Sequence, residues 1–252
     1  MAAPLYDHPG YYEIAFAFRD ISKEMDFFEE AIRRFSKIEV RNVLEVASGP
    51  SPYFEEWHGR GYRYCGLDTS PRMLNYVRRR ANRSRIPVQL FQRNLRTFSI
   101  RRLRVDLAYV LLGSLFVRSN KEFLEHLNCV ARVLRRGGLY LLDGVVWFRL
   151  LENRPPQWNF SRDGITVRCS VLWKVLEAAD QTVAEHISLE VNDHGRRKHF
   201  AERSIRKLFF PQEFLTLVNT HGKFIFCGWF NDFDLGKPAT DEGRQIVVLR
   251  KK

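Results

Sequence analysis

Short apolar runs alternate along this chain with longer segments in which apolar residues recur every three or four positions. Apolar runs bounded by small or charged residues are typical of buried parallel strands, and the amphipathic segments between them are typical of covering helices. The order therefore predicts an α/β fold with a mostly parallel sheet. The expected strands are 42–47, 62–67, 88–92, 106–112 and 139–146. The clearest helix between them is 121–134, with Arg135, Arg136 and Gly137-Gly138 after it as C-cap signals.

The amino-terminal region shows the longest amphipathic stripe. Between residues 14 and 35, seven apolar residues recur at alternating intervals of four and three, a spacing that predicts an amphipathic helix. They are Ile14, Phe18, Ile21, Met25, Phe28, Ile32 and Phe35.

The pattern changes between about 145 and 211. Segments 165–173, 182–191 and 199–208 each suit a strand, and turn residues separate them, so we expect an antiparallel insertion. A helix over 211–218 and strands over 223–230 and 245–250 then complete the sheet.

Two of the expected strands end in residues suited to a nucleoside. The strand at 42–47 runs into a turn containing Gly49, where the backbone can approach a ligand closely. Asp68 ends the next strand, placed to accept both hydrogen bonds of a ribose diol. The turn lacks the G-x-G-x-x-G pattern of dinucleotide-binding domains, so an NAD-dependent oxidoreductase is the least favoured alternative.

Four segments in order resemble the motifs of class I S-adenosylmethionine-dependent methyltransferases: 42–53, 66–74, 105–115 and 133–143. The resemblance covers nearly the whole chain. It implies a doubly wound, mostly parallel seven-stranded sheet with an antiparallel β insertion after strand five. It further implies one domain composed of an amino-terminal helical cap (1–38), a cofactor-binding core (39–146), an acceptor-side insertion (147–210) and a closing helix with two strands (211–252).

The same resemblance implies the residues of the site. S-adenosylmethionine is the expected cofactor, with Met73 beside the adenine and Asn94 where the family commonly has an acid. The expected cofactor contacts are Glu45, Ala47, Gly49, Pro50, Asp68, Thr69, Met73, Asn94, Leu95 and Leu111. The candidate acceptor contacts are Tyr11, Tyr12, Arg19, Ser114, Trp147 and Trp173.

Methyl transfer from a sulfonium requires alignment and water exclusion rather than a nucleophilic side chain. We expect a small-molecule acceptor, with nitrogen preferred over oxygen, and leave catalytic residues unassigned; Tyr12 and His186 are the candidate bases. Ser51 stands where a second glycine is common, and a positive φ there costs on the order of 1 kcal/mol. A non-catalytic methyltransferase-like binding protein is therefore a second hypothesis.

The net charge of +12 is concentrated in one block. Residues 60–104 contain thirteen Arg and a single acid, Asp68. Such a block suits a phosphate track, so an RNA methyltransferase is a third hypothesis. The four cysteines are scattered and no metal-ligand spacing appears, so we expect no metal. No apolar run is long enough for a membrane span, and we expect a cytoplasmic protein.

Overall fold

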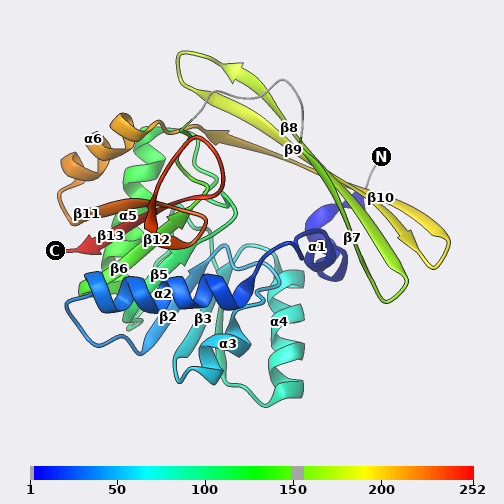
Figure 1. The fold of residues 1–252 in the computed structure, drawn as a ribbon, viewed down its shortest axis with the longest axis horizontal. Helices are drawn as coiled ribbons and strands as arrows, with labels where there is room; N and C mark the ends of the chain where they lie inside the picture. Colours follow the sequence, from blue (N-terminus) through cyan, green and yellow to red (C-terminus); the bar gives the residue numbers. More distant parts are fainter. Residues whose placement is uncertain (1–2, 149–155) are drawn as a thin grey trace.

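Two β-sheets of different kinds form the protein (Figure 1). The computed structural model describes residues 3–148 and 156–252. The larger, core sheet has the order β12-β11-β13-β6-β5-β2-β3-β4. Its strands are β2 (Asn42–Val46), β3 (Arg63–Asp68), β4 (Val88–Gln92), β5 (Val105–Val110), β6 (Leu134–Asp143), β11 (Phe224–Asn231), β12 (Asp234–Pro238) and β13 (Gln245–Lys251).

The core sheet confirms the expected mostly parallel arrangement. Strands β4, β3, β2, β5 and β6 pair in parallel, and β13 lies antiparallel between β6 and β11. The seven expected strands are all present. The short edge strand β12 is an eighth, formed from a segment for which we had expected no strand, and it pairs with β11.

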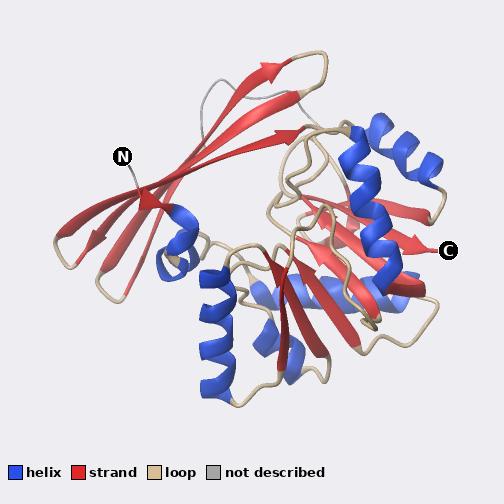
Figure 2. Cartoon of the chain, turned by 180° about the vertical axis from the view of Figure 1, so that it is seen from behind, coloured by secondary structure: helices blue, strands red, loops and turns tan. Residues whose placement is uncertain are grey.

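Helices cover both faces of the core sheet (Figure 2). On one face, α2 (Ile21–Phe35), α3 (Phe54–Gly59) and α4 (Pro71–Ser84) bury a layer of apolar side chains. On the other, α5 (Asn120–Val133) and α6 (Pro211–His221) bury a second layer. Removing both layers from water is the main driving force for this fold.

The prediction of a single amino-terminal helix from the apolar stripe is wrong. The structure breaks it into α1 (Pro9–Ala15) and α2. The break occurs because the Asp20 carboxylate accepts a hydrogen bond from the backbone N–H of Lys23, which starts a new helix at Ile21. Phe18, which belongs to the stripe, lies in the break and is 43% exposed.

The second sheet forms an arm that projects from the core (Figure 1). Its order is β1-β10-β9-β8-β7, and all its pairs except β1 with β10 are antiparallel. The expected antiparallel insertion is therefore confirmed, with β7 as a further strand. Residues 149–155 of the expected insertion (147–210) lie outside the described part of the chain. The strands are β1 (Ala3–Pro4), β7 (Gln157–Arg162), β8 (Ile165–Glu177), β9 (Thr182–Asp193) and β10 (Arg196–Lys207).

Helix α1 packs against this arm rather than continuing α2. Ile14, Ala15 and Phe16 share one apolar cluster with arm residues such as Leu189 and Phe200. We use the word cap from here on for η1 (Leu5–Asp7) together with α1, which is a shorter segment than the expected helical cap (1–38). The cap lies between the arm and the core (Figure 1).

The helix expected over 121–134 is confirmed as α5, but the expected C-cap role of Gly137-Gly138 is wrong. Helix α5 ends at Val133, and β6 begins directly at Leu134. Gly138 lies within the strand, where a Cβ atom would come 2.4 Å from the carbonyl oxygen of Asp106 on β5. Glycine is needed at this position because two strand backbones approach closely, not because a helix ends.

Candidate cofactor site

A cavity of about 110 Å³ lies at the carboxyl ends of β2, β3 and β4, beneath the cap. Ligands of open α/β sheets bind at this edge. Six of the ten expected cofactor residues line the cavity: Ala47, Gly49, Asp68, Thr69, Met73 and Leu95. The sequence pattern therefore brought most of its candidates to one place.

Asp68 anchors the cavity at the end of β3. One carboxylate oxygen accepts a hydrogen bond from the backbone N–H of Gly49 at 2.7 Å, and the other accepts one from Ser70 at 2.8 Å. Burial raises the pKa of this carboxyl group, although the amide donors act in the opposite direction. Each oxygen of a carboxylate has a second lone pair, so Asp68 can hold the loop and still accept two ribose hydroxyls.

The turn between β2 and α3, which we call the cofactor loop (residues 47–53), has an unusual backbone. Ala47, Gly49 and Ser51 all have positive φ, with values of 55°, 52° and 30°. The sequence left open whether this position needs a positive φ, and the structure shows that Ser51 has one. For a residue with a Cβ atom, this left-handed conformation costs roughly 1 to 2 kcal/mol of conformational free energy. The Ser51 hydroxyl offsets part of that cost, since it donates to Glu45 at 2.5 Å and accepts from the backbone N–H of Tyr53 at 3.3 Å.

Glu45 supports the cofactor loop through a hydrogen bond from Ser51 and does not line the cavity. Its carboxylate accepts from Ser51 and, at 2.6 Å, from the Tyr64 hydroxyl. Burial raises the pKa of Glu45 to about 7, and the two hydroxyl donors only partly oppose this shift.

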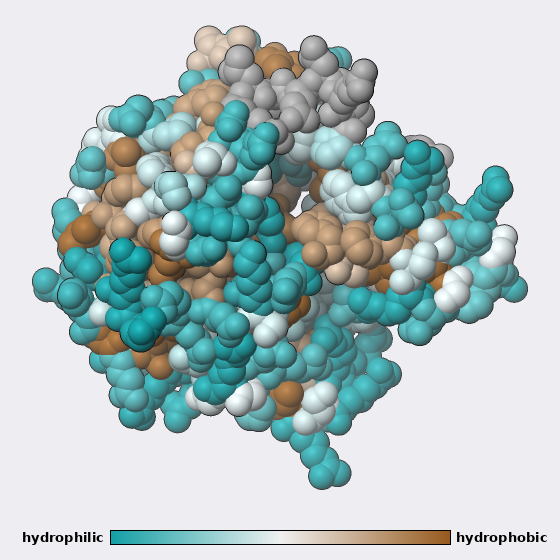
Figure 3. All heavy atoms as spheres, in the orientation of Figure 1, coloured by the Kyte–Doolittle hydropathy of each residue, from teal (hydrophilic) through white to brown (hydrophobic). Residues whose placement is uncertain are grey.

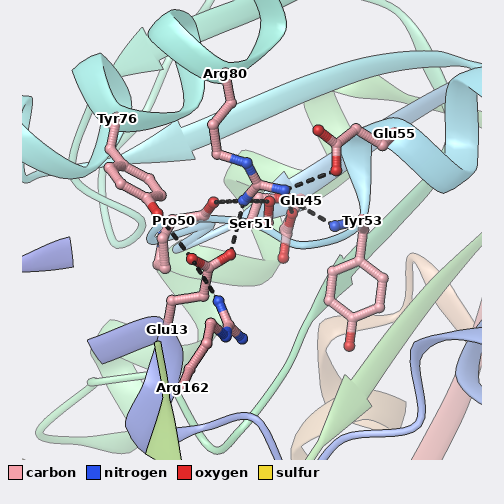
Figure 4. Close-up of polar contacts among 9 residues, drawn as sticks. All are labelled: Glu13, Glu45, Pro50, Ser51, Tyr53, Glu55, Tyr76, Arg80 and Arg162. Atoms are coloured by element: carbon pink, nitrogen blue, oxygen red, sulfur yellow. Dashed lines mark hydrogen bonds and ion pairs between the residues drawn. The ribbon is translucent and has the colours of Figure 1, made fainter. Parts of the chain in front are cut away.

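A guanidinium holds the outer side of the same loop (Figure 4). Arg80, on α4, donates to the carbonyl oxygens of Pro50 and Ser51, both at 3.4 Å. It also forms ion pairs with Glu55 of α3 at 2.7 Å and Glu13 of α1 at 3.0 Å. The loop is therefore held between a buried carboxyl group and a charged network.

The three remaining cofactor candidates lie beside the cavity rather than in its wall. The Pro50 carbonyl faces Arg80. The amide oxygen of Asn94 accepts from the backbone N–H of Arg96 at 2.9 Å, so it closes a local turn. Leu111 is buried, and the next residue, Leu112, donates its N–H to Asp143 at 2.8 Å.

The six acceptor candidates separate into four places. Tyr12 and Ser114 line the cavity. Tyr11 faces the arm, where its hydroxyl donates to Asp193 at 2.7 Å. Arg19 lies over the ring of Tyr53, with 5.4 Å between its guanidinium carbon and the ring centre.

The last two acceptor candidates meet each other where the arm joins the core. The rings of Trp147 and Trp173 pack edge to face, with centres 5.2 Å apart. Trp173 donates its indole N–H to Glu185 at 2.8 Å, and Glu185 pairs with buried Arg206 at 3.1 Å. Arg206 in turn lies over Phe116, which lines the cavity.

Five residues of the cavity wall were missed by sequence reasoning. Leu67 and Ser70 flank Asp68, so their proximity followed from the motif. Phe116 follows the expected Ser114 loop. Only their places in the sequence could have indicated Tyr6 and Arg93 as lining residues. Tyr6 precedes the amino-terminal apolar stripe, and Arg93 follows the end of strand 88–92. The full set is Tyr6, Leu67, Ser70, Arg93 and Phe116.

Six strands that run in the same direction (β4, β3, β2, β5, β6 and β11), an antiparallel strand β13 between β6 and β11, and a cavity at the carboxyl edge define the class I methyltransferase fold. Residues 43–138 match a family model described as a methyltransferase domain. Over these residues the chain is similar to a methyltransferase domain, as the motifs led us to expect.

Solved structures support the fold over the whole chain. An S-adenosylmethionine-dependent methyltransferase from Clostridium acetobutylicum is 17% identical, with a TM-score of 0.79 and 96% of both chains covered. An amino pentose methyltransferase of Micromonospora echinaspora, CalS10, is 18% identical, with a TM-score of 0.72 and 96% of both chains covered. The sugar N-methyltransferase KedS8 of Streptoalloteichus is 17% identical, with a TM-score of 0.71, covering 100% of this chain and 95% of its own. No curated protein sequence matches this chain.

The described residues contain no cluster of His, Cys, Asp and Glu that fits a metal ion. Among the same residues, no helix is both long and apolar enough to cross a membrane.

Proposed function

We propose that this protein transfers a methyl group from S-adenosylmethionine to the neutral amine of a small polar molecule. The reaction is an in-line displacement at the sulfonium methyl group, in which the amine lone pair forms the new C–N bond as the C–S bond breaks. S-adenosylhomocysteine leaves, and the methylated ammonium releases one proton to solvent. The protein supplies alignment and excludes water.

The observation that carries the proposal is the composition of the cavity wall, whose described lining contains no histidine and one acid, Asp68. Burial raises the pKa of both Tyr6 and Tyr12, so these hydroxyls keep their protons at neutral pH. Asp68 is already engaged by two backbone amides. Among the described residues that line the cavity, none is therefore suited to remove a proton from a hydroxyl acceptor. A neutral amine needs no such base. Tyr12 keeps a role as a hydrogen-bond donor, and His186 lies on β9, outside the lining.

The surroundings of the cavity support a small polar acceptor. The space-filling view is hollowed where the arm meets the core (Figure 3). Beside the cavity, where Arg206 lies over Phe116 and Trp147 packs on Trp173, the indole nitrogen of Trp147 and the Nε of Arg206 are buried donors without a partner in the described structure. An acceptor rich in oxygen atoms would satisfy them. The similarity to an amino pentose methyltransferase and a sugar N-methyltransferase points to the same chemistry, an amine on a hydroxylated ring.

The test uses matched pairs of acceptors. Amino sugars and the corresponding sugars with a hydroxyl in place of the amine are incubated with S-adenosylmethionine, and S-adenosylhomocysteine formation is measured between pH 6 and 9. We expect turnover only with the amines, rising with pH until the acceptor amine is neutral. Faster turnover of the hydroxyl partners would overturn the amine assignment. Donor binding without turnover on any acceptor would favour the non-catalytic hypothesis.

A further inference from the structure

Glu13 connects three parts of the molecule that surround the donor cavity. It lies on α1, and its side chain is only 17% exposed. One carboxylate oxygen pairs with Arg80 on α4 at 3.0 Å. The other accepts from the Tyr76 hydroxyl at 2.7 Å and from Arg162 of the arm strand β7 at 3.3 Å (Figure 4). The cap, the core and the arm therefore share one carboxylate.

Arg80 extends this connection to the cofactor loop. The same guanidinium nitrogen that pairs with Glu13 also donates to the carbonyl oxygens of Pro50 and Ser51. The other terminal nitrogen pairs with Glu55. A guanidinium is planar, and its donors are fixed relative to one another. Arg80 therefore fixes the position of the Glu13 carboxylate relative to the Pro50 and Ser51 carbonyl oxygens.

Donor binding requires a larger cavity than the one beneath the cap. Tyr6 and Tyr12, from the cap, form part of the cavity wall. The cavity volume of about 110 Å³ is well below the 300 Å³ or more that is typical of small-molecule sites. An outward shift of the cap would enlarge the cavity for S-adenosylmethionine, and such a shift breaks the Glu13–Arg80 pair.

We propose that Arg80 is a positioning residue for the methyl donor, and that through Glu13 it couples the conformation of the cofactor loop to closure of the cap. When the cap closes, Glu13 completes the network that holds the Pro50 and Ser51 carbonyls, so the donor is bound by a fixed loop under a closed cap. This inference rests on donor binding as proposed above. Coupling between two elements in proteins typically changes affinity by 5- to 150-fold.

The decisive comparison removes one partner of Arg80 at a time. Glu13→Gln breaks the link to the cap, whereas Glu55→Gln breaks a link of the same kind to α3, which makes no part of the cap. Dissociation of S-adenosylhomocysteine is followed by stopped flow with excess unlabelled ligand. We expect dissociation about tenfold faster for Glu13→Gln and Arg80→Met, and less than twofold faster for Glu55→Gln. Arg83→Met, an exposed change on the same helix, is the control and keeps the wild-type rate.

Two further measurements separate positioning from a purely structural role. The double variant Glu13→Gln/Arg80→Met should dissociate no faster than Arg80→Met alone, because both changes break one link. In hydrogen exchange, S-adenosylhomocysteine should protect the backbone amides of α1 in the wild type and much less in Glu13→Gln. Equal protection, equal dissociation rates, or additive effects would overturn the coupling while leaving donor binding intact. If the wild type itself binds no donor, the proposed function fails instead.

Discussion

The two ends of the core strands carry charges of opposite sign in different surroundings. At the carboxyl ends, Glu45 and Asp143 are buried and Asp68 is partly buried, and each accepts at least two hydrogen bonds. At the amino ends of β2, β3 and β4 a groove of about 770 Å³ carries Arg63, Arg101, Arg102 and Arg104, and none of its lining residues is acidic. We call it the arginine groove. In the described structure none of these four arginines pairs with a carboxylate.

The comparison shows that the densest charge of the sequence and the buried charge of the structure lie at opposite ends of the same strands. The arginine groove forms because residues 93–104 connect β4 to β5 without a helix, so one face of β3 and β4 stays open. Elsewhere in the same block, Arg60, Arg72, Arg80 and Arg96 pair with acids. The carboxyl ends, with few charges in the sequence, hold the cavity.

The largest predicted effect tests whether the buried acids depend on their partners. Arg244 pairs with both Glu24 and Asp143, which are 2% and 1% exposed. Arg244→Ala leaves two buried carboxylates uncompensated, and breaking a buried pair typically costs 3 to 5 kcal/mol. Urea unfolding should show a loss of about that size. Arg196→Ala, exposed on the arm, should change the unfolding free energy by less than about 0.5 kcal/mol. A loss below 1 kcal/mol for Arg244→Ala would contradict the prediction.

Asp68→Ala tests the carboxyl ends as the donor site. The change removes both the anchor of Gly49 and the expected ribose contacts, so we expect binding of S-adenosylmethionine to weaken by roughly 2 to 4 kcal/mol, about thirty- to a thousand-fold. Calorimetric titration measures this directly, with Asn75→Ala on α4 as the matched surface control. Unchanged affinity in Asp68→Ala would place the donor elsewhere.

Glu45→Gln tests the cost of a buried carboxyl group. Since the pKa of Glu45 is raised to about 7, the folded state holds its proton more tightly than the unfolded state. Stability from this group is therefore fully present at low pH and is lost as pH rises toward and through 7. The free energy of unfolding of the wild type, relative to Glu45→Gln, should fall by about 2 to 3 kcal/mol between pH 5 and 8. Parallel pH profiles of the two proteins would contradict the raised pKa.

The sequence predicted the core well because its signals are local. Strand 88–92 and helix 121–134 followed from periodicity alone, and Asp68 from its distance to Gly49. What it missed depends on contacts between distant segments. The break after Ala15 preserves the apolar spacing, so periodicity could not reveal it. Tyr6 reaches the cavity only because the cap packs on an arm that lies more than 150 residues further along.

The smallest predicted effect belongs to the arginine groove. Changing Arg63, Arg101, Arg102 and Arg104 together to Ala should leave the affinity for S-adenosylmethionine within twofold of the wild type. The six residues of β3 separate the two ends by roughly 20 Å, more than twice the Debye length of about 8 Å at physiological salt, so the charges are screened from the donor. The same variant tests the RNA hypothesis. If RNA were the acceptor, the variant would lose RNA methylation and the steep salt dependence of RNA binding. A donor affinity reduced more than tenfold would instead show that the two ends are coupled, and the contrast between them would fail.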